Sequence, residues 1–348
     1  MSYLGRIALL GLSVLTAVIV GAEKVKAQSF TFGFNAGRCE TDDEVAEADR
    51  AAYEGPALNF VRALLGPEPS NAYAAVAVAM KQTTTPEAFA AFVRTNVGSL
   101  GSIGNLHVAH SYYLTGTSTG TGQYRVLCTT VAHGSFSVPE GRVLVAATSA
   151  PEQAHVIVEG DTRNNTFAFV LWLLPEQGQW RVENMHLTAT AMAGKSALEF
   201  WSLARAQREH HHDFNAYVLY ATALQLASRG PAFQLGIQAE IEKELGQLQK
   251  PRELEGTPPF SWQLDGATFR ILKVAPVGID GKIYLMLSQE VAPWSDAPEV
   301  DRENHVLGSA FPKIDPEYTD AFDDLIIEAV ERGGARVFRT LARATSTL

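Results

Sequence analysis

The most conspicuous run of chemically active side chains is Glu209-His210-His211-His212-Asp213. Imidazole and carboxylate groups are common ligands of Zn²⁺. On a continuous helix Glu209 and Asp213 would share a face, but His210 and His212 would be offset by about 200° around the axis. The three imidazoles therefore cannot converge on one ion without ligands from elsewhere in the chain. We expect no metal and no other cofactor, and the alternative interpretation is a polar bend between two helices.

A single histidine, His186, is the candidate for acid–base chemistry. It lies in the segment 179–190, whose alternation predicts a strand. Read with a period of two residues, one face of that strand would carry Trp180, Val182, Asn184, His186 and Thr188. His186 would be the titratable group of a pocket on this face, and Asn184 would donate and accept hydrogen bonds. Alternatively, His186 is a structural residue, which is common for a histidine beside a tryptophan on a sheet.

Two tyrosines of the predicted strand 106–115 could complete such a pocket. Tyr112 and Tyr113 must point to opposite faces, and either could reach His186 across the sheet. No carboxylate with a matching orientation is evident, because Asp161 falls in a turn and Glu159 ends a strand. Abstraction of a carbon-bound proton needs a positioned base. The predicted ligand-binding residues are therefore Trp180, Asn184, His186, Tyr112 and Tyr113, with His186 as the one catalytic candidate.

Other catalytic motifs are not supported. Ser135, Ser196 and Ser288 lack the glycine-flanked elbow of a nucleophilic serine. The glycine- and threonine-rich stretch 115–122 lacks the Gly-Lys-Ser/Thr ending of a phosphate-binding loop, and it lies between two predicted strands.

The first 27 residues have the pattern of a secretory signal peptide. Arg6 precedes an uncharged stretch from Ile7 to Ala22, and small residues suit cleavage after Ala22 or, as we favour, after Ala27. The alternative is an uncleaved N-terminal anchor. We expect an exported protein, periplasmic or extracellular.

The overall charge restricts the partners. The chain carries a formal net charge of −10 at pH 7. Such a surface repels phosphate groups, so neither nucleic acid nor an anionic membrane surface is an expected partner. An unknown small molecule or a protein of the cell envelope is expected instead.

The two cysteines, Cys39 and Cys128, form an even set in a compartment where thiols oxidise. A Cys39–Cys128 disulfide is one expectation. The other is an unpaired Cys128 on a strand and a free Cys39 in a mobile arm.

The elements that would position these residues fall into an N-terminal and a C-terminal part. An arm at 28–44 leads into a domain at 45–190, with helices predicted at 43–65, 71–81 and from 85 onward. The start of the third is marked by the cap Thr85 before Pro86. Strands are predicted at 106–115, 122–133, 142–148, 154–160, 166–174 and 179–190.

The C-terminal part is predicted to begin with a helical hairpin at 195–250, whose last helix spans 232–248. An α+β region at 260–348 follows. It is predicted to contain strands at 260–265, 267–275 and 282–290, a proline-bearing loop at 293–316 and a closing helix at about 317–343.

Residues 45–190 resemble the nuclear-transport-factor-like superfamily, also called cystatin-like or SnoaL-like. The resemblance rests on the helix at 57–65, the Asn71-Ala72-Tyr73 and Thr85-Pro86-Glu87-Ala88-Phe89 helix starts, and the closing strand Gly178-Gln179-Trp180-Arg181-Val182. It implies an α+β cone, in which three helices pack on a twisted antiparallel sheet. The superfamily includes isomerases and polyketide cyclases as well as non-catalytic members, so it implies a fold and not a reaction.

These observations favour an exported, non-enzymatic binding or interaction module whose concave face holds a small molecule or a partner. The alternative is an isomerase- or cyclase-like enzyme that uses His186 as its base.

Overall fold

The computed structural model describes residues 37–42, 44–116, 124–129, 142–148, 150–334 and 336–342. The predicted signal peptide and the greater part of the predicted arm lie outside these residues. The chain divides into two compact units. The first contains the described residues up to Thr162 together with Thr166–Ala189 and Arg229–Gly236, and the second contains Arg163–Asn165, Thr190–Ser228 and the chain from Ile237 onward. Both mix helices and strands, which confirms the α+β class.

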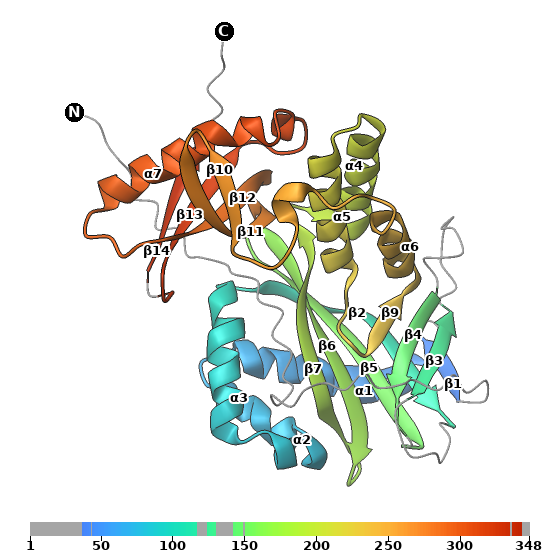
Figure 1. Ribbon diagram of the computed structural model, residues 1–348. Coiled ribbons are helices and arrows are strands. Elements are labelled where there is room, and N and C mark those ends of the chain that lie inside the picture. The colour runs from blue at the N-terminus through green and yellow to red at the C-terminus, as the bar shows by residue number, and fades with distance from the viewer. Residues whose placement is uncertain are drawn as a thin grey trace. The chain divides into compact units, whose positions relative to one another are not determined.

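The first unit is built on a strongly curled antiparallel sheet (Figure 1). Its strands follow the order β1-β2-β5-β6-β7-β8, with bounds β1 (Arg38–Thr41), β2 (Gly104–Thr115), β5 (Glu152–Asp161), β6 (Asn165–Glu176), β7 (Gln179–Met192) and β8 (Lys195–Ser196). The residues beyond Ala189 belong to the second unit. The predicted strands are confirmed within the described residues, because period-two alternation is a strong signal in a sheet with two different faces.

Helices cover one face of this sheet. They are α1 (Glu47–Leu65), the 3₁₀ helix η1 (Pro69–Ala75), α2 (Val78–Thr83), α3 (Pro86–Phe92), a π turn η2 (Val93–Val97) and a 3₁₀ turn η3 (Gly98–Leu100). Thr85 caps α3 by accepting a hydrogen bond from the Ala88 backbone at 3.2 Å, as predicted. The single helix predicted at 71–81 is wrong, because Val76 leaves the helix to form a bridge with Val182 of β7.

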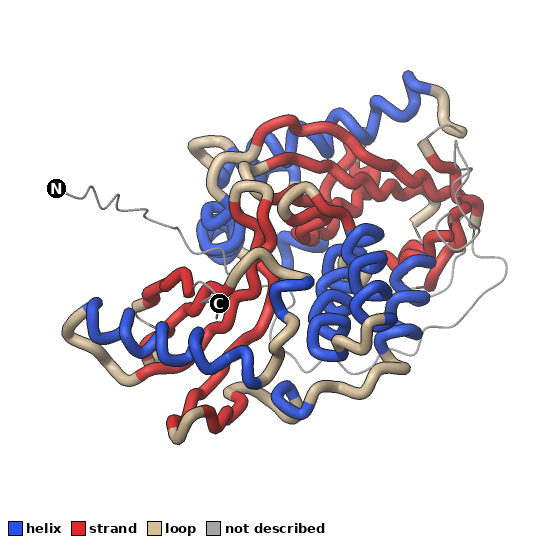
Figure 2. The backbone as a smooth tube through the Cα atoms, turned by 90° about the horizontal axis from the view of Figure 1, so that it is seen from above, coloured by secondary structure: helices blue, strands red, loops and turns tan. Residues whose placement is uncertain are grey.

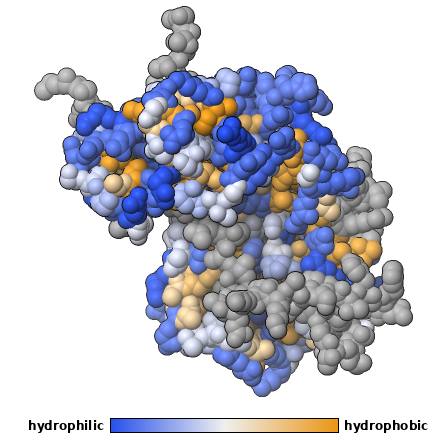
Figure 3. Space-filling view, viewed as in Figure 1, coloured by the Kyte–Doolittle hydropathy of each residue, from blue (hydrophilic) through white to orange (hydrophobic). Residues whose placement is uncertain are grey.

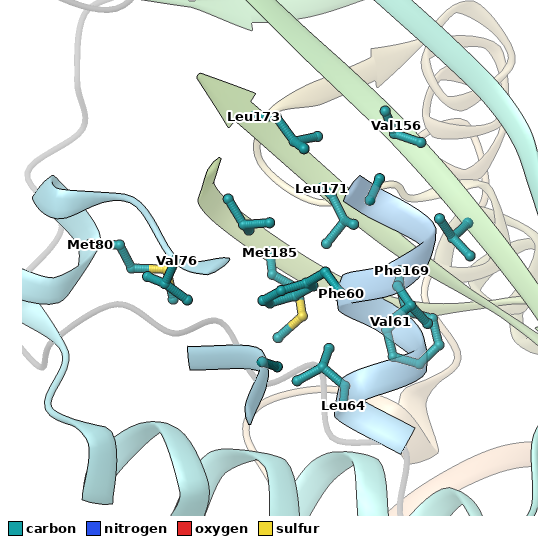
Figure 4. Close-up of a cluster of buried hydrophobic side chains, with 14 of the residues drawn as sticks. Phe60, Val61, Leu64, Val76, Met80, Val156, Phe169, Leu171, Leu173 and Met185 are labelled. Carbon is teal, nitrogen blue, oxygen red and sulfur yellow. The ribbon is translucent and has the colours of Figure 1, made fainter. Parts of the chain in front are cut away.

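The space between the helices and the sheet is filled by side chains. Figure 4 shows Phe60, Val61 and Leu64 of α1 facing Phe169 and Leu171 of β6. All five are buried. Burial of each such side chain contributes about 1.5–3 kcal/mol, so this core dominates the stability of the first unit.

The opposite face of the sheet carries a second, smaller core. Here β3 (Tyr124–Thr129), β4 (Arg142–Ala147) and β9 (Phe233–Leu235) form a separate three-stranded sheet. Cys39 of β1 and Cys128 of β3 are joined by a disulfide with a Cα–Cα distance of 5.3 Å. The expected disulfide is confirmed.

The second unit begins with the hairpin of α4 (Ala197–Glu209) and α5 (Asp213–Ala227), followed by α6 (Gly236–Leu245) and a 3₁₀ turn η4 (Arg252–Leu254). Glu244 of α6 fixes that helix to the hairpin. Its Oε2 accepts hydrogen bonds from Trp201 Nε1 at 2.9 Å, Arg205 Nε at 2.9 Å and the Tyr220 hydroxyl at 2.8 Å. Arg205 above all, with Tyr220 and Trp201, lowers the pKa of Glu244 to about 2.

A five-stranded sheet completes this unit. Its order is β10 (Phe260–Leu264), β11 (Ala267–Ile279), β12 (Lys282–Val291), β13 (Leu325–Glu331) and β14 (Val337–Ala342). Only the β12–β13 pairing is parallel, and α7 (Ala297–Ala310) forms part of the connection between those two strands. Figure 2 shows α7 running along the strands of this sheet. The 3₁₀ turns η5 (Phe311–Lys313) and η6 (Tyr318–Asp320) lead into β13.

Three predictions for the C-terminal part are wrong. The closing helix at 317–343 is instead the pair β13 and β14, which turn at Gly333-Gly334, where both residues have positive φ. The predicted loop at 293–316 contains α7, because Pro298 falls in the first turn, where a helix tolerates proline. The predicted helix at 232–248 starts later, since β9 occupies 233–235.

Among the described residues, no helix combines the length and apolar character needed to cross a membrane. On the face of the molecule in Figure 3, hydrophilic residues predominate and hydrophobic residues form separate small patches.

Candidate functional site

A groove of about 550 Å³ runs beside Trp180 in the first unit. We call it the Trp180 groove. One wall is a stripe of α1, η1 closes the far side, and the tip of the β6–β7 hairpin forms the third wall. Its lining is Ala52, Pro56, Asn59, Phe60, Ala63, Asn71, Ala72, Ala75, Gly178, Gln179, Trp180 and Arg181. Small side chains on α1 and η1 leave the space open.

The indole of Trp180 is held firmly by two tyrosines. Tyr53 and Tyr113 stack with ring centroids 5.7 Å apart and an interplanar angle of 3°. Trp180 stands edge-on to both, with centroids at 5.7 Å from Tyr53 and 6.3 Å from Tyr113. Aromatic pairs in this geometry add about 0.5–1.5 kcal/mol each beyond the area that they bury. The groove therefore has a rigid aromatic wall.

The polar groups of the Trp180 groove favour an anionic ligand. Arg181 is the only charged residue among its lining residues. Its guanidinium donates from Nη1 to the Ala74 carbonyl at 3.0 Å and from Nη2 to Gln179 Oε1 at 2.5 Å. Asn59, Asn71 and Gln179 add amide groups. An apolar groove with a few fixed polar groups has the usual composition of a small-molecule site.

The five predicted ligand-binding residues do not share one face of the sheet. Trp180 and Tyr113 pack in the helix-side core, whereas Tyr112 belongs to the core on the opposite face, where its ring lies 5.6 Å from Phe233. His186 also faces that second side, and Asn184 is exposed. Of the predicted set, the structure brings together only Trp180 and Tyr113, with Tyr53 as a third member.

An interruption of the alternation in β7 explains this division. Val182 and Met185 both pack in the helix-side core although their spacing is odd. At this point the Val182 carbonyl accepts a hydrogen bond from the Ala77 backbone at 2.9 Å. The strict period of two used to place Trp180 and His186 on one face therefore fails between them.

His186 is buried among apolar atoms, with 7% of its surface exposed. Its Nε2 has no hydrogen-bond partner among the described residues, and burial lowers its pKa. Gly230 lies directly against the ring, since a Cβ at that position would be 2.5 Å from His186 Cγ. The described residues supply no carboxylate hydrogen-bonded to His186, so the catalytic alternative gains no support from this geometry.

No sequence pattern singles out His155, which has the most strongly shifted pKa of the histidines in the described residues. It is 0% exposed, and neither ring nitrogen has a hydrogen-bond partner within the described residues. The ring stacks on Trp172 at 4.9 Å and meets Phe233 edge-on at 5.3 Å. Burial lowers its pKa to about 3, opposed only by the nearby Ala146 backbone. It sits in the predicted strand 154–160, but only the strand pairing reveals that Tyr112, His155 and Trp172 form one cross-strand row.

We expect acid to destabilise the first unit through His155. The unfolded histidine binds a proton below about pH 6.5, and the folded one only near pH 3. The unfolded state therefore holds more protons in this interval, and stability falls as the pH is lowered. At about pH 4.5 the loss should reach roughly 2–3 kcal/mol. This loss of stability can be measured by unfolding the protein in urea at each pH and monitoring the first unit through amide hydrogen exchange in β5 and β6.

The matched variants for this prediction are His155→Phe and His107→Gln. The first should remove most of the loss of stability between about pH 6.5 and 4.5, because phenylalanine fills the same apolar site without a titratable group. His107 is exposed, so its variant should retain the wild-type pH dependence. Equal pH dependence in all three proteins would contradict the assignment to His155.

The run 209–213 forms the bend between α4 and α5, in agreement with the alternative interpretation of the sequence. The helix ends at Glu209, His211 adopts a positive φ of 63°, and α5 begins at Asp213. The rings of His210 and His212 lie 5.8 Å apart, and His212 Nδ1 is 2.9 Å from Gln207 Oε1. No group of three or more His, Cys, Asp or Glu residues in the described part of the chain is placed to hold a metal ion.

Comparison of the chain with protein-family models, with curated proteins and with solved structures finds no match.

Proposed function

We propose that this chain is an exported, non-catalytic binding protein whose first unit holds an apolar molecule with an anionic group in the Trp180 groove. The observation that carries the proposal is the groove itself: a space of about 550 Å³ with a rigid indole wall, several alanines and, among its lining residues, a single cation. Its volume falls within the roughly 300–1,000 Å³ typical of small-molecule sites. The Arg181 guanidinium would pair with the anionic group, and the indole and alanines would contact the apolar part.

Export is supported by two independent features. The signal-peptide pattern at 1–27 would direct the chain out of the cytoplasm. The Cys39–Cys128 disulfide is of the kind that persists in oxidising compartments.

A cone of the nuclear-transport-factor-like type is the fold that we propose for the first unit. Its support is the order of elements, in which α1 to α3 precede β2, β5, β6 and β7 of the curled antiparallel sheet and pack on one of its faces. In this arrangement the Trp180 groove lies at the rim of the helix-side core and not inside it, since that core is filled.

Binding of 8-anilinonaphthalene-1-sulfonate tests the proposed site, because this probe combines an apolar aromatic body with one negative charge. We expect saturable fluorescence enhancement with the wild-type protein. Ala52→Trp should lower the affinity for the probe at least about tenfold, because an indole at this exposed position of α1 fills the groove. Arg181→Gln should lower the affinity for the probe by about threefold, because the cation is lost.

The control is Ala51→Trp, which places the same indole on the next residue of α1. Ala51 is exposed and does not line the groove. Its affinity for the probe should equal that of the wild type. Equal affinities for the Ala51 and Ala52 variants, or the lack of saturation with wild type, would refute binding in the Trp180 groove.

A further inference from the structure

A second groove, in the second unit, lies between α7 and the strands β11 and β12. It has a volume of about 400 Å³, and we call it the α7 groove. Thr268, Phe269 and Arg270 of β11 form one side, and the loop at Pro293-Trp294 closes one end. The facing side is α7, which contributes Glu299, Val300, Glu303 and Val306.

The floor of the α7 groove is apolar. Val291 and Val300 belong to a small buried cluster against which Trp294 and Phe338 pack. Phe269 is also buried. Val306, at the rim, is 50% exposed. These residues offer a surface for one aliphatic or aromatic side chain.

The aromatic end of the groove is fixed in place. The Arg336 guanidinium lies 4.6 Å from the centroid of the Trp294 ring and donates to the Trp294 carbonyl at 2.5 Å. Glu331 holds the same guanidinium by two hydrogen bonds, at 3.1 and 2.5 Å. Little conformational freedom of Trp294 would be lost when a ligand binds.

The charges of the α7 groove do not balance. Glu290 is neutralised by Arg270 at 2.6 Å, with Arg332 at 3.6 Å. Glu299 and Glu303 are exposed and have no ion-pair or hydrogen-bond partner among the described residues. They stand one turn apart on α7, a spacing at which like charges repel. A cation placed between them would relieve this repulsion.

We propose that the α7 groove binds a basic, amphipathic peptide segment of a partner protein, with Lys or Arg at Glu299 and Glu303 and an apolar side chain on the floor. Charge complementarity selects a cationic partner, and the apolar floor beside Val306 selects a segment that alternates basic and apolar residues. The groove is separate from the Trp180 groove in its residues and in the sign of its charge.

The test uses a fluorescein-labelled peptide of alternating lysine and leucine residues and a second peptide with glutamine in place of lysine. Fluorescence anisotropy at about 50 mM salt should show binding of the lysine peptide only, because surface charges are weakly screened there. The double variant Glu299→Gln/Glu303→Gln should lower the affinity about tenfold. Thr268→Trp, which fills the groove from an exposed strand position, should have an effect of at least that size.

The matched control is Glu47→Gln/Glu87→Gln, which removes the same charge from two exposed positions of the first unit. Its affinity for the lysine peptide should be within about twofold of the wild-type value. The variant Ala52→Trp, which blocks only the Trp180 groove, should also retain this affinity. Equal weakening by the control pair would mean non-specific attraction to an acidic protein and would overturn the proposal. So would equal binding of the glutamine peptide, or full affinity in the Thr268→Trp variant.

Discussion

Reduction of the Cys39–Cys128 disulfide is expected to lower the free energy of unfolding of the first unit by about 4–5 kcal/mol. The two cysteines are 89 residues apart in the sequence, so the bond closes a long loop and removes much conformational freedom from the unfolded chain. In the folded state the bond ties β1 to β3, and β1 is the edge strand of its sheet. Reduction should therefore also increase the fraying of β1.

Urea unfolding of the first unit with and without dithiothreitol measures this difference. The double variant Cys39→Ser/Cys128→Ser is the control, because its stability should not respond to the reductant. An unchanged midpoint in the wild-type protein after complete reduction would show that the disulfide contributes little to the stability of this unit.

The variant Asp315→Asn is expected to stabilise the second unit at neutral and alkaline pH by up to about 3–4 kcal/mol. Asp315 is 3% exposed, and its Oδ2 has no hydrogen-bond partner among the described residues. Burial, together with the negative charges of Glu317 and Asp320, raises its pKa from 3.8 to about 7. Ionising this group in the folded state is therefore unfavourable.

The sign of the pH dependence follows from these values. Between pH 3.8 and about 7 the folded state retains a proton that the unfolded state has lost. Wild-type stability should therefore fall as the pH rises through this interval, while asparagine, which cannot ionise, should not show the fall. The two proteins should be equally stable near about pH 4 and differ most above about pH 7.

The measurement is urea unfolding across this pH range, with the second unit monitored through amide hydrogen exchange in β12 and β13. Asp296→Asn is the control, since Asp296 is exposed and makes no side-chain cap bond to α7. A stability difference between wild type and Asp315→Asn that does not change with pH would contradict the buried, protonated state of Asp315.

Local patterns in the sequence predicted several elements of the first unit, but not the break at Val76 within the helix predicted at 71–81. Alternation of apolar residues predicted its strands, and Thr85-Pro86 predicted the start of α3. The C-terminal predictions failed where two signals compete. The segment Leu325–Glu331 is buried along almost its whole length, as suits a strand between two neighbours, and a helical period can be read into the same residues.

The candidate sites depend on information that no local pattern contains. The sequence predicts Trp180 as a ligand-binding residue, but the groove beside it is formed with α1 and η1, which lie more than a hundred residues earlier in the chain. His186 was placed on the wrong face because the alternation in β7 changes by one residue between Val182 and Met185. The α7 groove combines two strands, a loop and a helix, and their proximity follows only from the order of the sheet.

A crystal structure of the full chain with 8-anilinonaphthalene-1-sulfonate would show whether the Trp180 groove holds an apolar anion. We expect density for the probe against the Trp180 indole, between α1 and η1, with its sulfonate beside Arg181. Clear density for the probe at another site, with an empty Trp180 groove, would contradict it.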